Sequence, residues 1–425
     1  MKFAIIGLST LGLFTATALS KYHEITLFDE EEKRISKIKN QYVHDNGDGF
    51  LDDFTLAKEK FQYASSLQEI IEKESIIFLC IDKIDSKGKL NYNWLFTLLQ
   101  RIAEMASHPL TLIIRTTLPI GTIAKIKNIL CEMKKDNIIS IIYFPYFHVD
   151  GYHYHHFSSP SHLLVGRDED RLHLLMMEIL SPMMTADTKI YYATCKEAEI
   201  ILYSYFSYRS AQMAFFDEIQ AICGKEQVDI GMVLDAIPNQ EIQKISANEI
   251  SPSYQVELRE FSHWKEQNQL PNGIVKDSYE SLKKKTNSIL QWISSHLSTP
   301  LANKKCAILG LSSSEDRYDL RFSFVASFIK LLLQEHVTVY AYDPNIETIF
   351  QEYYKDLSDV HYMQSVRTAI KDADFVIVLS DEKAFRKIKE QDFIIMMKKN
   401  PILFDYVGIY RNLRIRLFSY FSYYK

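Results

Sequence analysis

Two glycines and an aspartate near the start of the chain have types and spacing suited to binding a dinucleotide. Gly7 and Gly12 bound the turn GLSTLG, which follows the apolar run KFAII, and Asp29 ends the next apolar run, EITLF. In a strand–turn–helix–strand unit, such glycines let the backbone approach a pyrophosphate, and an acid about 20 residues later accepts hydrogen bonds from ribose hydroxyls. The sequence therefore predicts a cofactor site that includes Gly7, Gly12 and Asp29.

Ser9 stands at the middle position of this turn, where a second glycine is usual. Because that glycine allows the closest approach of the backbone to a pyrophosphate, the Cβ and hydroxyl of Ser9 would crowd or redirect the cofactor. Arg34 completes the candidate cofactor-binding residues of this unit. The turn is compatible with ordinary binding of a dinucleotide and with weak or lost binding.

The first residues, MKFAIIGLSTLGLFTATALS, also have a second interpretation. A lysine, an apolar run and small residues near Ala16 and Ala18 are typical of a secretory signal peptide. A signal peptide requires nothing of the residues that follow it, whereas a dinucleotide-binding unit requires a second strand that ends in an acid. The run EITLF followed by Asp29 supplies that strand and favours the dinucleotide-binding unit.

Four histidines, His148, His153, His155 and His156, lie close together in HVDGYHYHH. Histidine clusters can bind zinc or copper. These histidines lack an accompanying pattern of acids or cysteines, so we expect a surface segment and no metal.

Alternating strands and helices must position these residues. From residue 1 to 193, apolar runs such as SIIFLCI, LTLIIRTT and IISIIYF alternate with helical stretches, which is typical of a parallel sheet covered on both faces. From 194 to 299 helical periodicity takes over, and KEAEIILYSYFSYRSAQMAFFDEIQAIC predicts one long helix that can form an inter-subunit contact. From 300 to 425 the alternation resumes with KKCAILGL, VTVYAYDP and DFVIVLS. We expect an α/β protein with a Rossmann-like domain (1–193), a central helical domain (194–299) and a second Rossmann-like domain (300–425).

Composition narrows the class of protein further. The formal net charge is −5 with lysine and arginine scattered, which indicates no surface for nucleic acid or an anionic membrane. The five cysteines are spread singly, as buried thiols of a reducing compartment are. Apart from the first 20 residues, no apolar stretch approaches the ~18 residues that would span a bilayer. We expect a cytoplasmic globular protein.

The order of these pieces resembles the UDP-glucose/GDP-mannose dehydrogenase family. The turn at Gly7 resembles that family's GxGxxG turn, RTTLPIGT (115–122) its STVPVGT loop, and residues 144–166 its NPEFLxEG segment with the strand after it. KEAEIILY resembles the family's EAELIKY helix, ILGLSSSEDRYDLRFS its LGLAFKxxTDDxRxS stretch, and AYDP is shared. The resemblance implies an NAD-binding N-terminal domain, a helical dimerisation core and a UDP-binding C-terminal domain.

The resemblance also implies a reaction, the NAD-dependent oxidation of the C6 alcohol of a nucleotide sugar to a carboxylate in two hydride transfers. In the family a cysteine thiolate captures the aldehyde, and water hydrolyses the thioester that forms. The matching position in this chain is Ser253, whose hydroxyl lacks the acidity and the leaving ability of a thiol, so a thioester route cannot run through it. The aspartate of the same loop corresponds to Glu257.

Other catalytic positions differ as well. The family's lysine and asparagine, four residues apart on one helical face, correspond to Leu202 and Phe206, which cannot donate hydrogen bonds to an alkoxide. The glutamate of NPEF corresponds to Tyr146. The matching positions that keep a polar side chain are Thr117 and Asp150 as candidate catalytic residues, Thr116 as a candidate cofactor-binding residue and Arg321 as a candidate substrate-binding residue. An arginine there can donate to a diphosphate or cap the domain junction.

Two functions agree with these residues. The first is an NAD-dependent nucleotide-sugar 6-dehydrogenase with an altered site, in which one hydride transfer could still give an aldehyde. The second is a catalytically silent relative that binds sugar nucleotides or dinucleotides, or acts as a scaffold, in polysaccharide biosynthesis. Because the nucleophile, lysine, asparagine and glutamate are all replaced, we favour the second. For both functions we expect a homodimer with NAD and a UDP-sugar as its ligands. The affinity for NAD can be ordinary, weak or lost, because Ser9 replaces the second glycine of the turn.

Overall fold

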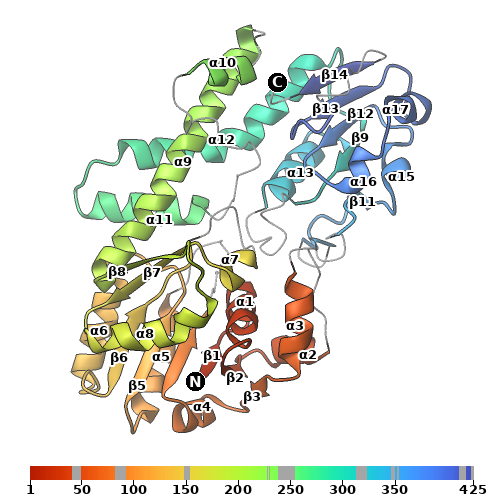
Figure 1. Cartoon of the computed structure of the whole chain (residues 1–425). Coiled ribbons are helices and arrows are strands. Elements are labelled where there is room, and N and C mark those ends of the chain that lie inside the picture. The colour runs from red at the N-terminus through yellow and green to blue at the C-terminus, as the bar shows by residue number, and fades with distance from the viewer. Residues whose placement is uncertain are drawn as a thin grey trace. The chain divides into compact units, whose positions relative to one another are not determined.

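The computed structural model describes residues 1–40, 49–81, 92–147, 154–226, 228, 230–237, 254–312, 323–345, 350–351, 354–410 and 418–422. It divides into two compact units, Met1–Phe206 with Glu260–Pro271, and Ser207–Arg259 with Asn272–Lys425. Each unit contains one β-sheet (Figure 1). The units are described separately below.

The first unit is built on an eight-stranded sheet in the order β3-β2-β1-β4-β5-β6-β7-β8. Its strands are β1 (Lys2–Ile6), β2 (Glu24–Phe28), β3 (Gln62–Tyr63), β4 (Ile76–Leu79), β5 (Leu110–Ile114), β6 (Ile139–Tyr143), β7 (His162–Arg167) and β8 (Lys189–Ala193). Strands β1 to β6 are parallel and follow the doubly wound order, with the chain reversing direction across the sheet between β1 and β4. Strand β1 is central in the sheet, which agrees with a dinucleotide-binding unit rather than with a signal peptide.

The central strands are apolar on both faces because helices cover both sides of the sheet. All four residues of β4 are buried, and β1 buries four of its five residues. The helices of this unit are α1 (Thr10–Leu19), α2 (Glu32–Lys39), α3 (Phe50–Lys58), α4 (Leu67–Lys73), α5 (Asn93–Met105), α6 (Thr122–Glu132), α7 (His155–Ser158) and α8 (Arg171–Leu180), with a 3-10 turn at Ser181–Met183. Helix α1 is buried over most of its length and packs against α3 and α7 through Phe14, whose ring centroid lies 4.5 Å from that of Phe50.

Strand β7 departs from the expected all-parallel arrangement. It pairs antiparallel with β6, and β8 is parallel to β7. In the part of the β6–β7 connection that the structure describes, the only helix is the single turn α7. A parallel return normally needs a longer crossover helix, so the chain leaves β6 and comes back in the opposite direction.

The second unit has a six-stranded parallel sheet in the order β11-β10-β9-β12-β13-β14. Its strands are β9 (Lys305–Leu309), β10 (Thr338–Tyr342), β11 (His361–Tyr362), β12 (Phe375–Val378), β13 (Ile402–Asp405) and β14 (Ser419–Ser422), and its helices include α13 (Phe324–Gln334), α15 (Val366–Ile370), α16 (Lys383–Arg386) and α17 (Glu390–Met396). This is the same doubly wound order as in β1 to β6. The predicted α/β class with two Rossmann-like sheets is confirmed.

Helices occupy the chain between the two sheets. They are α9 (Cys195–Glu226), α10 (Ile230–Ala236), α11 (Tyr254–Gln267) and α12 (Gly273–His296). The predicted long helix is α9, and it begins in the first unit and ends in the second. Within the described residues, no helix combines the length and the apolar character needed to cross a membrane.

Candidate functional site

The turn after β1 is shaped by two glycines in close contact with backbone atoms. Gly7 has φ +94°, and a Cβ on it would lie 2.3 Å from Ile81 Cγ1 and 2.7 Å from the Cys80 carbonyl oxygen. A Cβ on Gly12 would lie 1.8 Å from the carbonyl oxygen of Gly7. Both positions therefore exclude a side chain, the first for its backbone conformation and its neighbours, and the second because α1 lies directly against the turn.

Ser9 is the N-cap residue of α1, and its hydroxyl does not cap the helix. The hydroxyl donates instead to the Cys80 carbonyl oxygen at 3.1 Å. The first turn of α1 contains no acidic residue, so the positive end of the helix dipole is not neutralised by its own side chains. That end lies at the carboxyl edge of β1, where doubly wound sheets bind their ligands.

Asp29 is buried at the end of β2 and closes the same turn. One carboxylate oxygen accepts from the Leu8 backbone N–H at 2.7 Å and the other from the Glu31 N–H at 2.8 Å. The Arg34 guanidinium lies 3.3 Å from Asp29 and also 3.3 Å from Glu31. The structure thus brings the candidate cofactor-binding residues Arg34 and Asp29 together, and Asp29 bonds to the main chain of the turn itself.

The proline-containing loop 115–121 follows β5 at the same edge of the sheet. The Thr116 hydroxyl donates to the Ile81 carbonyl oxygen at 2.9 Å and accepts from the Ile81 N–H at 3.1 Å. Thr117 is buried beside it. The guanidinium of Arg115 lies 4.3 Å from the ring centroid of Phe144 and is also buried. Thr116 therefore links the ends of β4 and β5, next to the point between β1 and β4 where the chain reverses direction.

Tyr146 follows β6 and forms an aromatic pair with α7. Its ring stacks on Phe157 with centroids 4.4 Å apart, and its hydroxyl lies 3.3 Å from Nδ1 of His156. Tyr146 is buried, whereas His156 is only half-buried. The pair combines a phenol with an imidazole, which are groups that can pass a proton between them.

Leu202 and Phe206, one turn apart on α9, are both buried. Phe206 makes an edge contact with Tyr203, and Tyr203 packs on Phe261 with centroids 5.1 Å apart. At the positions of Leu202 and Phe206, α9 therefore presents buried side chains without a polar group.

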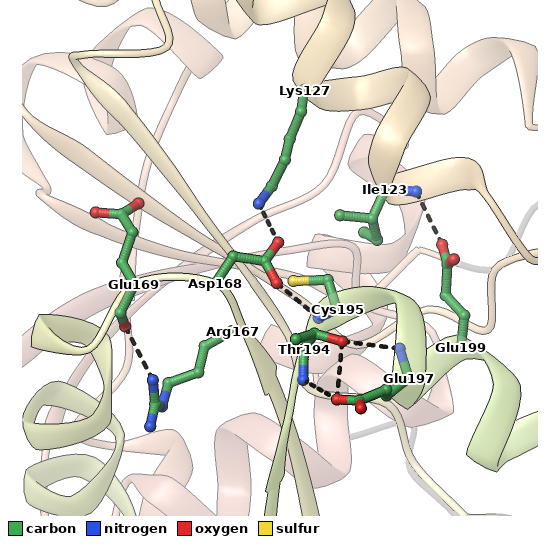
Figure 2. A network of polar contacts seen from close by, with 9 residues as sticks. All are labelled: Ile123, Lys127, Arg167, Asp168, Glu169, Thr194, Cys195, Glu197 and Glu199. Atoms are coloured by element: carbon green, nitrogen blue, oxygen red, sulfur yellow. Dashed lines mark hydrogen bonds and ion pairs between the residues drawn. The ribbon is translucent and has the colours of Figure 1, made fainter.

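Figure 2 shows polar contacts that the sequence did not reveal. The carboxylate of Glu199 on α9 accepts from the backbone N–H groups of Gly121 at 2.7 Å and Ile123 at 2.8 Å. Asp168 accepts from the Cys195 N–H at 3.0 Å and pairs with Lys127. The only sequence signal for Glu199 was its place in KEAEIILY, which carried no assigned role.

Burial and hydrogen bonding shift several pKa values in this network. Burial raises the pKa of Glu199, although the backbone donors oppose that rise. Burial, with the nearby Asp168, raises the pKa of the Cys195 thiol to about 12, so this cysteine is not a nucleophile near neutral pH. For Asp168 burial acts upward, but the hydrogen bonds from Lys127 and the Cys195 N–H outweigh it and lower the pKa.

Comparison with known proteins places the two sheets in one family. The NAD binding domain of the UDP-glucose/GDP-mannose dehydrogenase family matches residues 1–184, and the UDP binding domain of that family matches residues 307–412. The chain belongs to the UDP-glucose/GDP-mannose dehydrogenase family.

Relatives of known name cover nearly the whole chain at low identity. UDP-glucose 6-dehydrogenase of Rickettsia conorii is 22% identical over 425 residues, which cover 97% of this chain and 96% of the relative. The enzyme of the same name from Rhizobium meliloti is 19% identical over 423 residues, with the same coverage of 97% and 96%. A UDP-glucose dehydrogenase from Pyrobaculum islandicum has a TM-score of 0.84 at 16% identity, covering 99% of this chain and 97% of that chain. The last comparison shows that this family member shares the fold.

As a member of the UDP-glucose/GDP-mannose dehydrogenase family, the chain keeps a backbone that fits NAD. The turn that a Cβ would fill at Gly7 and Gly12 and the uncapped start of α1 are present. Asp29 is in place, with its carboxylate also used inside the protein. Ser9 is the one departure within the turn, and its hydroxyl is directed to a backbone carbonyl.

Several predicted site residues lie outside the described residues. These are Ser253, Asp150, Arg321, His148 and His153. Glu257 is buried in α11 of the second unit. Among the described residues, no group of three or more histidine, cysteine, aspartate or glutamate side chains is placed to hold a metal. Of the predicted histidine cluster, His155 is exposed and His156 contacts Tyr146.

Proposed function

We propose that the chain binds NAD with its first unit and also binds a UDP-sugar, the substrate class of its family. We propose further that it does not catalyse the oxidation of that sugar to a carboxylate. The observation that carries this proposal is the burial of Leu202 and Phe206 on α9, where the ring of Phe206 contacts that of Tyr203. By resemblance, a lysine and an asparagine at these positions would stabilise oxyanion charge. The side chains of Leu202 and Phe206 have no donor for that purpose.

The number of replaced groups supports the same conclusion. Each donor of this kind typically contributes about 3–4 kcal/mol to transition-state stabilisation. The nucleophile position, Ser253, has a hydroxyl that does not form thioesters. The contributions of catalytic groups that act together are not additive, so the individual values cannot be summed. The loss of several such groups still removes most of the catalysed rate.

A second candidate function is a single oxidation that stops at the aldehyde, and the contact between Tyr146 and His156 favours it. NAD, when bound, supplies a hydride acceptor. In this chain the Tyr146 hydroxyl would take the proton of the C6 alcohol and pass its own proton to the neutral imidazole of His156. The alcohol then loses two electrons and two protons in total, and no thioester is required.

Assembly and surroundings complete the proposal. Helix α9 exposes Ile201, Tyr208, Phe215 and Ile222 at intervals of seven residues, which suits a contact with a second copy of the chain. We propose that the chain forms a homodimer. We propose also that it has three domains, 1–193, 194–299 and 300–425, and that it acts in polysaccharide biosynthesis. The five cysteines, all free thiols and four of them buried, support a cytoplasmic location.

Titration and turnover measurements test the proposal. Calorimetric titration with NAD alone and with UDP-glucose alone should give binding, and NADH absorbance should stay flat when both are present. Ser9→Gly should tighten NAD binding if the Ser9 Cβ crowds the pyrophosphate. Turnover to the acid would refute the silent function, and turnover to the aldehyde alone, lost in His156→Gln, would favour the second candidate. Absence of binding to either ligand would refute both functions.

A further inference from the structure

Glu199 is a buried acid that neither candidate reaction uses. Its side chain extends from α9 to the start of α6, where it accepts from the N–H group of Gly121. It also accepts from the N–H group of Ile123 (Figure 2). Gly121 is the N-cap position of α6 and has no side chain that could cap the helix. A carboxylate from a different helix therefore satisfies N–H groups that a capping side chain would normally satisfy.

A second carboxylate, which belongs to neither helix, also connects α6 with α9. Asp168, just after β7, accepts from the backbone N–H of Cys195 at the first residue of α9. The same carboxylate pairs with Lys127, which lies on α6 (Figure 2). Helices α6 and α9 are thus linked at two points, one at the start of α6 and one at Lys127 near its middle.

The segment that Glu199 holds is the end of loop 115–121. The beginning of this loop is fixed to the sheet, because Thr116 pairs with Ile81. Its middle is fixed by the Tyr143 hydroxyl, which accepts from the Leu118 N–H at 3.2 Å. The Gly121 N–H is the third point of attachment, and its partner lies on α9 rather than on the sheet. Loop 115–121 follows β5 at the edge of the sheet where the dinucleotide is expected.

The burial of Glu199 is unfavourable for stability near neutral pH. Burial raises the pKa of this carboxyl, so the ionised form is disfavoured in the folded protein. A raised pKa in the folded state contributes stability at low pH and loses it as the pH rises through the folded pKa. Buried carboxyl groups with a shifted pKa are frequent at functional sites.

We propose that Glu199 is the positioning residue of loop 115–121, which it holds against the cofactor edge of the sheet. This inference rests on the proposed binding of NAD for its effect on affinity, but not for its effect on the loop. The carboxylate sets where Gly121 lies, and the rigid attachment at Thr116 then leaves the loop one conformation. Loss of the bond from Gly121 to Glu199 frees the end of the loop, while Asp168 still connects Lys127 on α6 to the first residue of α9.

Glu199→Gln tests the inference, with Glu197→Gln as the matched control. The amide keeps the size of the side chain but has a single acceptor oxygen, and its NH₂ group faces a backbone donor. Glu197 lies two residues away on the same helix, is exposed, and accepts only from Thr194, at 2.8 Å from its N–H and 2.9 Å from its hydroxyl. Hydrogen exchange of the peptide that contains Gly121 and Ile123, and the dissociation constant for NAD, are measured on the full chain.

We expect Glu199→Gln to speed amide exchange at Gly121 and Ile123 by about tenfold or more and to weaken NAD binding by about tenfold, while Glu197→Gln changes neither. Amide exchange in the other helices should stay at the rate of the parent, because a general loss of stability would speed it there as well. Unchanged exchange at Gly121 and Ile123 overturns the inference at any affinity for NAD. If the parent protein does not bind NAD, faster exchange still supports the loop assignment and only the proposed function fails.

Discussion

Restoring the family's lysine at Leu202 is expected to destabilise the protein rather than revive the reaction. The Leu202 side chain is 0% exposed. In Leu202→Lys the new ammonium would be buried, and the carboxylate one turn earlier on α9, that of Glu199, already accepts from two backbone N–H groups of another segment. An uncompensated buried charge costs about 3–5 kcal/mol, which is a large part of the ~5–15 kcal/mol that stabilises a typical protein. The asparagine position, Phe206, is closed in the same way.

Urea unfolding followed by circular dichroism measures this effect, with two controls. Leu202→Met keeps the volume and should cost less than about 1.5 kcal/mol. Ile200→Lys places the same ammonium on the same helix at a residue that is 42% exposed, and should lie within about 0.5 kcal/mol of the parent. The double variant Leu202→Lys, Phe206→Asn should show no turnover of NAD with UDP-glucose.

One result would refute this reasoning directly. If Leu202→Lys unfolds within about 1 kcal/mol of the parent, the lysine has reached water or an anion. The α9 face would then border an open site, and the buried Leu202 would no longer support the loss of catalysis. Turnover in the double variant would lead to the same conclusion.

Two further predictions concern the scaffold. Gly7→Ala should lower the free energy of unfolding by about 1–2 kcal/mol for its left-handed backbone and by about 1–3 kcal/mol more for the close contact. Gly49→Ala, with φ +81° and open space around the Cβ, should show the backbone cost alone. Equal losses for the two variants in urea unfolding would contradict the close approach of the turn. Lys127→Met removes the partner of Asp168, whose pKa is lowered in the folded state, so the stability lost should be greatest above pH about 4 and should shrink as the pH falls through the lowered pKa. Exposed Lys125→Met on the same helix should show no such change, and a loss independent of pH would exclude the ion pair as its cause.

The sequence predicted the strands that are buried on both faces and missed those at the edges. SIIFLCI and DFVIVLS became β4 and β12, because a strand covered on both sides is a continuous apolar run. The edge strands β3 and β11 have two residues each, and no pattern distinguishes so short a strand from a loop. The direction of β7 was not predictable either, since apolar composition carries no information on pairing sense.

Spacing also revealed only part of the candidate site. Gly7, Gly12 and Asp29 were found because their contacts follow from one local unit of strand, turn and helix. The bonds from Gly121 and Ile123 to Glu199 join residues 78 and 76 positions apart. Such a contact depends on how β7, β8 and α9 return to α6, so a reading of local motifs could not supply it. The partner of Tyr146 was missed for a similar reason, because the role of α7 depends on its packing against α1.

The residues that match the family's motifs are those with contacts to the main chain. Asp29 holds two backbone N–H groups, and Asp343 holds two at the corresponding turn of the second sheet, at 2.9 and 2.8 Å. Folding alone therefore accounts for Asp29, and its presence is weak support for cofactor binding. Leu202 and Tyr146, in contrast, stand where the resemblance implies catalytic side chains, and the fold accepts an apolar or an aromatic group there. Folding alone therefore requires Asp29 and Asp343 but does not require catalytic side chains at Leu202 and Tyr146. For this reason the motif does not determine the affinity of the turn at Ser9 for NAD, and titration must measure it.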